Sequence, residues 1–201
     1  MDVAARVQDV DEREAIWART LRDYPGPKNA ASVERGRKEA EIMRRKLDRV
    51  GQPFHLEFVD AIKGTRISME TLKGKVVVLD FWATWCGPCI AEMPRMKKLY
   101  AEYKDKGVEF IGVSLDEAVE NGGLDKLKDF VAANGIEWPQ YYQDNNLNVE
   151  FSTSWGIIGI PSVFLVDTDG NLASVEARGK LEEMIPKLLG KAKPRTAPTN
   201  P

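Results

Sequence analysis

Apolar residues near the start of the chain recur at steps of three, four or seven, the spacing of one helical face. In the first segment they are Val3, Val7, Val10, Trp17, Leu21 and Tyr24, with Glu14 as an interruption. The prolines and glycine of YPGPKNAAS then break the helix, and Asn29 or Ser32 is expected to cap a second one. The second helix carries Val33, Ala40, Met43, Leu47 and Val50, and Gly51 and Pro53 end it. Residues 1–50 are therefore predicted to form a helical hairpin extension.

After Gly51 the pattern changes to alternation and short apolar runs. FHLEFVDA alternates as a strand, SMETLKGK favours a turn of helix, and VVVLDFW is a run of the kind buried on both faces of a parallel sheet. Further along we expect a helix from about Cys86 to Lys104, a strand in VEFIGVSL, a helix in LDKLKDFVAANG closed by Gly135, and a short helix in NLNVEFSTSWG. PSVFLVD and LASVEAR then pair through Asp169-Gly170, and KLEEMIPKLLG forms the last helix.

This order of elements predicts an α/β fold, with a central mixed sheet flanked by helices. Helices separate parallel strands first, and an antiparallel pair follows. We assign residues 51–190 to this domain, and we expect the polar, proline-rich tail at 191–201 to be disordered.

Composition excludes several classes of function. A chain of 201 residues with 43% hydrophobic content can bury a real core. Its 29 basic and 31 acidic residues give a net charge of -2, which provides no electrostatic case for binding nucleic acid or an anionic membrane surface. No apolar run is long enough to span a bilayer, and the first residues lack the apolar core of a signal peptide.

The chain has two cysteines, and both lie in Cys86-Gly87-Pro88-Cys89, where a strand passes into a helix. The free N–H groups and the dipole at a helix start favour a thiolate, and Pro88 is tolerated in the first turn. The spacing brings the sulfurs close enough for thiol–disulfide exchange. Zinc would need two further ligands, and His55 is the one other candidate among Cys and His. The pair is therefore predicted to be a redox centre rather than a metal site or inert thiols.

Asp80 stands inside the apolar run VVVLDFW. Burial of a carboxylate disfavours its charged form, so we expect its pKa to be raised and the group to be partly neutral near pH 7. A structural, hydrogen-bonding acid is the alternative interpretation.

FWATWCGPC followed by GIPSVFLVD resembles the thioredoxin superfamily, and LKGKVVVLDFWATWCGPCIAEMP resembles its TlpA/ResA-like branch of bacterial thiol–disulfide oxidoreductases. The resemblance covers roughly Gly51–Gly190 and implies a thioredoxin-like fold with a branch-specific insertion around residues 116–150. It implies that Cys86 is the exposed nucleophile, Cys89 the buried resolving thiol, and Pro161 a cis proline facing the disulfide. A cis bond after Ile160 would let an extended substrate pair with its backbone.

The resemblance also implies roles for two acids and two tryptophans. Asp80 matches a buried aspartate that takes the proton of the resolving thiol, and Glu92 matches a glutamate near the active site. Having both suggests a coupled pair, with a solvated helix residue as the alternative for Glu92. Trp82 is expected beneath the active-site loop, whereas Trp85 is expected on its surface. The predicted substrate-binding residues are Trp85, Ile160, Gly87 and Pro88.

The insertion offers Asp116, Glu117 and Glu120 as oxygen ligands, but their spacing matches no calcium-binding EF-hand loop. We therefore expect no metal and no cofactor beyond a redox-active disulfide between Cys86 and Cys89.

The predicted function is reduction of protein disulfides through a mixed disulfide, because Gly-Pro between the cysteines resembles reductants more than strong oxidants. The alternatives are a non-catalytic thioredoxin-like binding module that docks partners through the hairpin, and a peroxiredoxin-branch peroxidase. The latter would need threonine or serine where Ala83 stands.

The expected partners are protein disulfide or dithiol substrates and an upstream reductant, with no nucleic acid, and the protein is expected to be a monomer. The resemblance implies an extracytoplasmic location in bacteria, in the periplasm or cell envelope. Because this chain has no exporting segment, we expect it to be part of a longer protein that is membrane-tethered or exported.

Overall fold

The structure is a computed structural model that describes residues 12, 15–144 and 150–190. The chain divides into two compact units, Met1–Val50 and Gly51–Pro201. The expected start of the first helix, including Val3, Val7, Val10 and Glu14, lies outside the described residues, as does the tail at 191–201.

In the first unit, residues 15–23 are helical and α2 spans Pro27–Leu47. Gly26 is the N-cap of α2, and its first turn contains a proline, whose missing N–H would have had no partner there. Asn29 and Ser32 already lie inside this helix and donate to backbone carbonyls. The prediction that one of them caps the helix is therefore wrong.

Trp17 packs the first helical segment against α2. Its indole covers the backbone at Gly36, where a Cβ would come within 2.7 Å of the ring. Val33 and Ala40 of α2 are buried. The predicted two-helix extension is thus present in the described residues.

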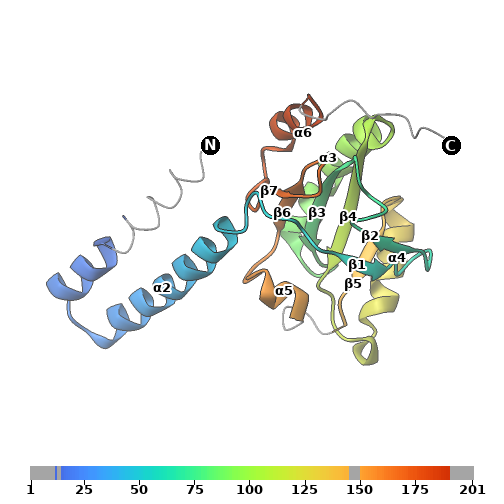
Figure 1. Cartoon of the computed structure of the whole chain (residues 1–201). Helices are drawn as coiled ribbons and strands as arrows, with labels where there is room; N and C mark the ends of the chain where they lie inside the picture. Colours follow the sequence, from blue (N-terminus) through green and yellow to red (C-terminus); the bar gives the residue numbers. More distant parts are fainter. Residues whose placement is uncertain (1–11, 13–14, 145–149, 191–201) are drawn as a thin grey trace. The chain divides into compact units, whose positions relative to one another are not determined.

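The second unit contains a five-stranded mixed sheet in the order β5-β4-β3-β6-β7 (Figure 1). The strands are β3 (Val76–Trp82), β4 (Val108–Ser114), β5 (Gln140–Tyr142), β6 (Ser162–Val166) and β7 (Leu172–Ser174). β3, β4 and β5 run parallel, whereas β6 runs antiparallel to β3 and to β7. Every residue of the central strand β3 is buried, as its continuous apolar run predicts.

The helices of this unit lie against the sheet (Figure 1). They are α3 (Gly87–Tyr103), α4 (Gly123–Asn134), α5 (Glu150–Ser154) and α6 (Leu181–Gly190), with 3-10 turns η1 (Lys104–Lys106) and η2 (Val119–Asn121). α4 ends at Gly135 in the left-handed region, with a φ of 58°, which a glycine adopts without steric cost. In the described part of the chain, none of the helices combines the length and the apolar character that crossing a bilayer requires.

Three local predictions differ from the structure. β1 (Glu57–Val59) pairs with β2 (Arg66–Ser68), which is not among the predicted strands. SMETLKGK does not contain the expected turn of helix: Ser68 is the last residue of β2, and the residues after it form turns. The strand expected in LASVEAR ends at Ser174, where the regular pairing with β6 stops. The loop that follows keeps one bond to β6, from the N–H of Ala177 to the carbonyl of Val163, and then turns toward α6. Arg178 therefore lies in the loop before α6.

Candidate active site

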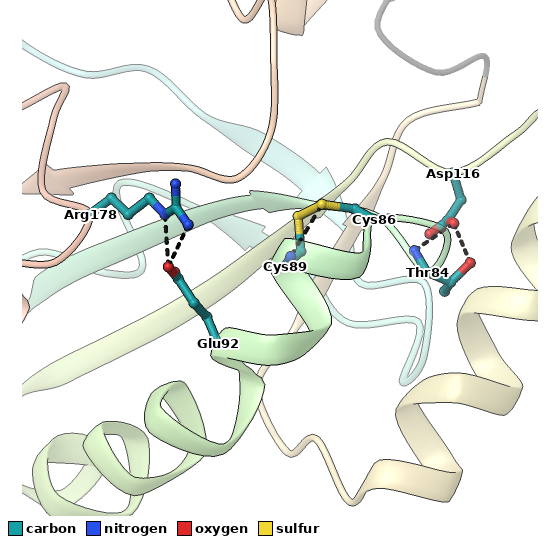
Figure 2. Close-up of a disulfide and its surroundings, with 6 residues drawn as sticks. All are labelled: Thr84, Cys86, Cys89, Glu92, Asp116 and Arg178. Atoms are coloured by element: carbon teal, nitrogen blue, oxygen red, sulfur yellow. Dashed lines mark hydrogen bonds and ion pairs between the residues drawn. A yellow bond between two sulfur atoms is a disulfide. The ribbon is translucent and has the colours of Figure 1, made fainter.

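Cys86 and Cys89 form a disulfide at the start of α3, with their Cα atoms 5.3 Å apart (Figure 2). Cys86 is the N-cap of the helix, and the N–H of Cys89 donates to its Sγ at 3.3 Å. Pro88 stands in the first turn, where its missing N–H leaves no bond unmade. Because backbone N–H groups at a helix start stabilise negative charge, this geometry favours a thiolate on Cys86 once the disulfide is reduced.

Both cysteines are buried in the disulfide form, with Cys86 5% exposed and Cys89 4%. The expectation of an exposed Cys86 is therefore wrong for this form. What distinguishes the two residues is their position: Cys86 precedes the helix and accepts an N–H, whereas Cys89 lies inside it.

A buried aspartate fixes the loop that leads into Cys86. Asp116, 1% exposed, accepts the N–H of Thr84 at 2.9 Å and its hydroxyl at 2.6 Å (Figure 2). The hydroxyl of Ser114, at the end of β4, donates to the other carboxylate oxygen at 2.8 Å. The loop before the cysteines is thereby tied to the end of the neighbouring strand.

Sequence reasoning considered Asp116 as a metal ligand and missed this role. Both of its carboxylate oxygens are engaged by Thr84 and Ser114, and Glu117 is paired with Lys126. The signal that was available is an acid two residues after the serine that ends a buried strand.

Asp80 is buried in β3, at 7% exposure, as predicted from the apolar run around it. Its pKa is raised from 3.8 to about 7, chiefly because burial disfavours the carboxylate. The charge of Glu92 raises this pKa further, whereas the charge of Arg178 lowers it. The expected burial and the expected direction of the pKa of Asp80 are confirmed, whereas a coupled pair of acids stays a prediction.

Glu92 lies one turn after Cys89 on α3 and forms an ion pair with Arg178 (Figure 2). Nε of Arg178 donates to Oε1 of Glu92 at 2.8 Å, and Nη2 lies 2.7 Å from the same oxygen. Glu92 is therefore paired, not a solvated helix residue. Arg178 stands 86 positions away in the sequence, and no local pattern linked the two.

The peptide bond between Ile160 and Pro161 is cis, as the resemblance implied. Directly after it, Ser162 pairs in register with Phe81 near the end of β3. Pro161 thus lies near the carboxyl end of β3, the end from which the chain continues into the cysteine turn.

The two tryptophans occupy different environments. Trp82 is buried, packs against the tilted ring of Phe130 of α4, and donates its indole N–H to Gln140 at 3.1 Å. Trp85 is 53% exposed, and the neighbouring Gly87 and Pro88 are also exposed. Contact of these surface residues with a substrate stays a prediction.

Comparison with known proteins places this arrangement among redox proteins. The family model described as Redoxin matches residues 49–189. The chain is 35% identical over 150 residues to the thiol-disulfide oxidoreductase ResA of Halalkalibacterium halodurans, covering 75% of this chain and 81% of that protein. It is 31% identical over 134 residues to ResA of Bacillus subtilis, covering 65% of this chain and 69% of that protein.

A solved structure shows the same fold. The crystal structure of a thiol:disulfide interchange protein from Chlorobium tepidum, described as a thioredoxin family protein, superposes with a TM-score of 0.57 at 26% identity. The match covers 69% of this chain and 94% of that one.

Proposed function

This chain belongs to the Redoxin family as a ResA-like thiol–disulfide oxidoreductase of the thioredoxin superfamily, and we propose that it reduces disulfide bonds in proteins. The observation that carries this proposal is the Cys86–Cys89 disulfide at the start of α3, with the N–H of Cys89 on the sulfur of Cys86. A thiolate held there after reduction is the nucleophile that disulfide exchange requires.

The proposed reaction has two exchange steps. The Cys86 thiolate attacks a substrate disulfide, so that a mixed disulfide forms and one substrate sulfur leaves as a thiolate. Cys89 then loses its proton and attacks Sγ of Cys86, which releases the second substrate sulfur. The substrate gains two electrons, and the cysteine pair is oxidised to the disulfide. A dithiol reductant returns the pair to its reduced form, and no cofactor beyond the cysteines is required.

Asp80 is proposed to accept the proton of Cys89. Its raised pKa, about 7, lets it take up and release a proton near neutral pH. Glu92 modulates this acid through its charge rather than serving as a second base, because Glu92 is held in an ion pair.

The surface around Cys86 is proposed to bind an extended segment of the substrate. Trp85, Gly87 and Pro88 are exposed beside the disulfide, and the backbone of Ile160 precedes the cis bond. Pairing of the substrate backbone with Ile160 would hold the mixed disulfide in place.

Reduction of insulin by dithiothreitol tests the proposal. The chain should accelerate the precipitation of reduced insulin, and Cys86→Ser should abolish this effect. Cys89→Ser should instead accumulate a mixed disulfide with the substrate, detectable by mass and cleaved by excess dithiol. A chain whose cysteines cycle between states without accelerating insulin reduction would contradict the proposed activity.

The same preparation separates the alternatives. A peroxidase would consume hydrogen peroxide in a dithiol-dependent manner faster than it reduces insulin. A binding module would show neither activity, and its disulfide would resist cycling by dithiothreitol.

We further propose that the protein acts outside the cytoplasm, in the periplasm or cell envelope, on protein disulfide or dithiol substrates. An upstream reductant would return its cysteine pair to the reduced form, and the protein would be a monomer. The ResA-like family supports this location, with the native protein tethered or exported. Cell fractionation of the protein expressed from its native gene tests the location, and light scattering after size-exclusion chromatography tests the monomer.

A further inference from the structure

The loop that carries Arg178 is attached to the sheet beside Asp80. After β7, the N–H of Ala177 donates to the carbonyl of Val163 at 3.0 Å, and Val163 is the residue of β6 that lies in register with Asp80. The N–H of Lys180 then bonds to the carbonyl of Ala177 at 2.9 Å and closes a turn. These two bonds fix the position of the backbone at Arg178.

The turn depends on a glycine. Gly179 has a φ of 75°, in the left-handed region that an L side chain rarely adopts, and it occupies the third position of the four-residue turn from Ala177 to Lys180. Arg178 occupies the second position, and its guanidinium reaches Glu92 on α3 (Figure 2).

On the helix side, Glu92 follows Cys89 by three residues, so the two side chains share one face of α3. A second ion pair lies further along α3, where Arg95 makes two contacts to Glu182 at the start of α6. The Glu92–Arg178 pair is the one nearer to the cysteines along the helix.

We propose that Arg178 is a positioning residue of the redox site: it holds Glu92 as a paired carboxylate, so that Asp80 alone exchanges the proton of Cys89. This assignment rests on the proposed function and goes beyond it, because it adds a residue from the loop before α6 to the site. Arg178 does not touch the sulfurs. It acts through the carboxylates.

The elements that carry the Glu92–Arg178 pair also carry other charged residues. α3 contributes Glu92 and Arg95, the loop contributes Glu176, Arg178 and Lys180, and α6 begins with Glu182. The charges that shift the pKa of Asp80 come from Glu92, which raises it, and from Arg178, which lowers it. The two partners of one ion pair therefore act on Asp80 in opposite directions.

The opposite effects of Glu92 and Arg178 on the pKa of Asp80 can be measured in the step in which Cys89 resolves the mixed disulfide. The thiol of Cys89 gives its proton to the ionised carboxylate of Asp80, the sulfur bonds to Sγ of Cys86, and the bond from Cys86 to the substrate sulfur breaks. The resolving step needs ionised Asp80, so its rate rises with pH through the pKa of Asp80. A variant that raises this pKa moves the rise to higher pH, and one that lowers it moves the rise to lower pH.

The test follows the carboxyl carbon of Asp80 by ¹³C NMR during a pH titration of the oxidised chain, in wild type and four variants. Arg178→Gln should move the midpoint to higher pH, and Glu92→Gln should move it to lower pH. Arg178→Lys keeps the positive charge and should stay near wild type. Arg95→Gln is the matched control, because it removes a neighbouring ion pair between α3 and α6 and should leave the midpoint in place.

Kinetics of the resolving step provide the second readout. Below the wild-type midpoint, Arg178→Gln should resolve the mixed disulfide roughly two- to threefold more slowly, the size expected for losing one half-exposed charge. At high pH the two rates should converge. Arg178→Lys should restore the wild-type profile.

The inference is overturned if Arg178→Gln and Glu92→Gln move the Asp80 midpoint in the same direction, or if Arg95→Gln moves it as far as Arg178→Gln does. The titration needs no turnover, so it separates this result from failure of the proposed function. Suppose that the chain does not reduce insulin, but that Arg178→Gln and Glu92→Gln move the Asp80 midpoint in opposite directions. The proposed activity would then be refuted, and the electrostatic role of Arg178 would stand. If Arg178→Gln does not fold, Glu92→Gln should still move the Asp80 midpoint to lower pH while Arg178→Lys leaves it near wild type, and the reverse pattern would overturn the inference.

Discussion

Replacing Asp80 with asparagine should stabilise the protein at neutral pH, although it removes a proposed catalytic group. The pKa of Asp80 is raised from 3.8 to about 7 in the folded chain, because burial disfavours its charge. Between these values the folded state binds more protons than the unfolded state, so stability falls as pH rises. Above the folded pKa the loss is complete.

The magnitude follows from the size of the shift. A difference of about three units, at about 1.4 kcal/mol per unit, makes ionised Asp80 cost about 4 kcal/mol of folding free energy above the folded pKa. Asparagine carries no charge at any of these pH values and avoids this cost. The gain of Asp80→Asn should therefore be near zero at about pH 4 and approach about 4 kcal/mol at about pH 8.

Urea unfolding of the oxidised chain at both pH values measures this. The difference between the two gains is the decisive quantity, because any packing cost of the amide cancels in it. Asp60→Asn is the matched control: Asp60 is also buried, but its carboxylate accepts three backbone N–H groups, from Ile62, Lys63 and Gln140. That substitution should cost about 1 to 3 kcal/mol at neutral pH. Equal gains for Asp80→Asn at low and high pH would refute the reasoning.

Three further substitutions test other parts of the site. Asp116→Ala leaves the Thr84 N–H and two hydroxyls without their acceptor, so we expect a loss of about 2 to 3 kcal/mol in urea unfolding and slower insulin reduction; unchanged activity would show that the loop does not need this anchor. Trp85→Ala should lower kcat/KM for insulin about five- to tenfold while leaving reduction of a small disulfide unchanged, and equal losses on both would exclude a substrate-contact role. Gly112→Ala places a Cβ against the amide of Gln140 and displaces the acceptor of the indole N–H, so it should cost about 1 to 3 kcal/mol in urea unfolding, and wild-type stability would contradict that packing.

Local patterns were sufficient for the main elements of the second unit. The continuous apolar run of β3 predicted a strand buried on both faces, and Gly135 predicted where α4 ends. Short elements were less predictable. β2 has three residues, none of them fully buried, so its sequence shows too little of the apolar–polar alternation by which a strand is predicted. β7 was expected to continue through Arg178, because apolar alternation cannot show where a strand loses its neighbour.

For the site, the sequence by itself determined which groups carry the chemistry. Spacing placed Cys86 and Cys89 within one turn, and an acid inside an apolar run predicted the burial and raised pKa of Asp80. These are local properties, since neighbouring residues in the chain create them.

Tertiary structure alone decided the partners of those groups. Arg178 meets Glu92 because a loop after β7 bonds to β6 and turns at Gly179, and Asp116 meets Thr84 because two parallel strands end at the same edge of the sheet. Charges act through space, not along the sequence, so residues 32 and 86 positions apart set the shape and the charge of the redox site only after the sheet has formed.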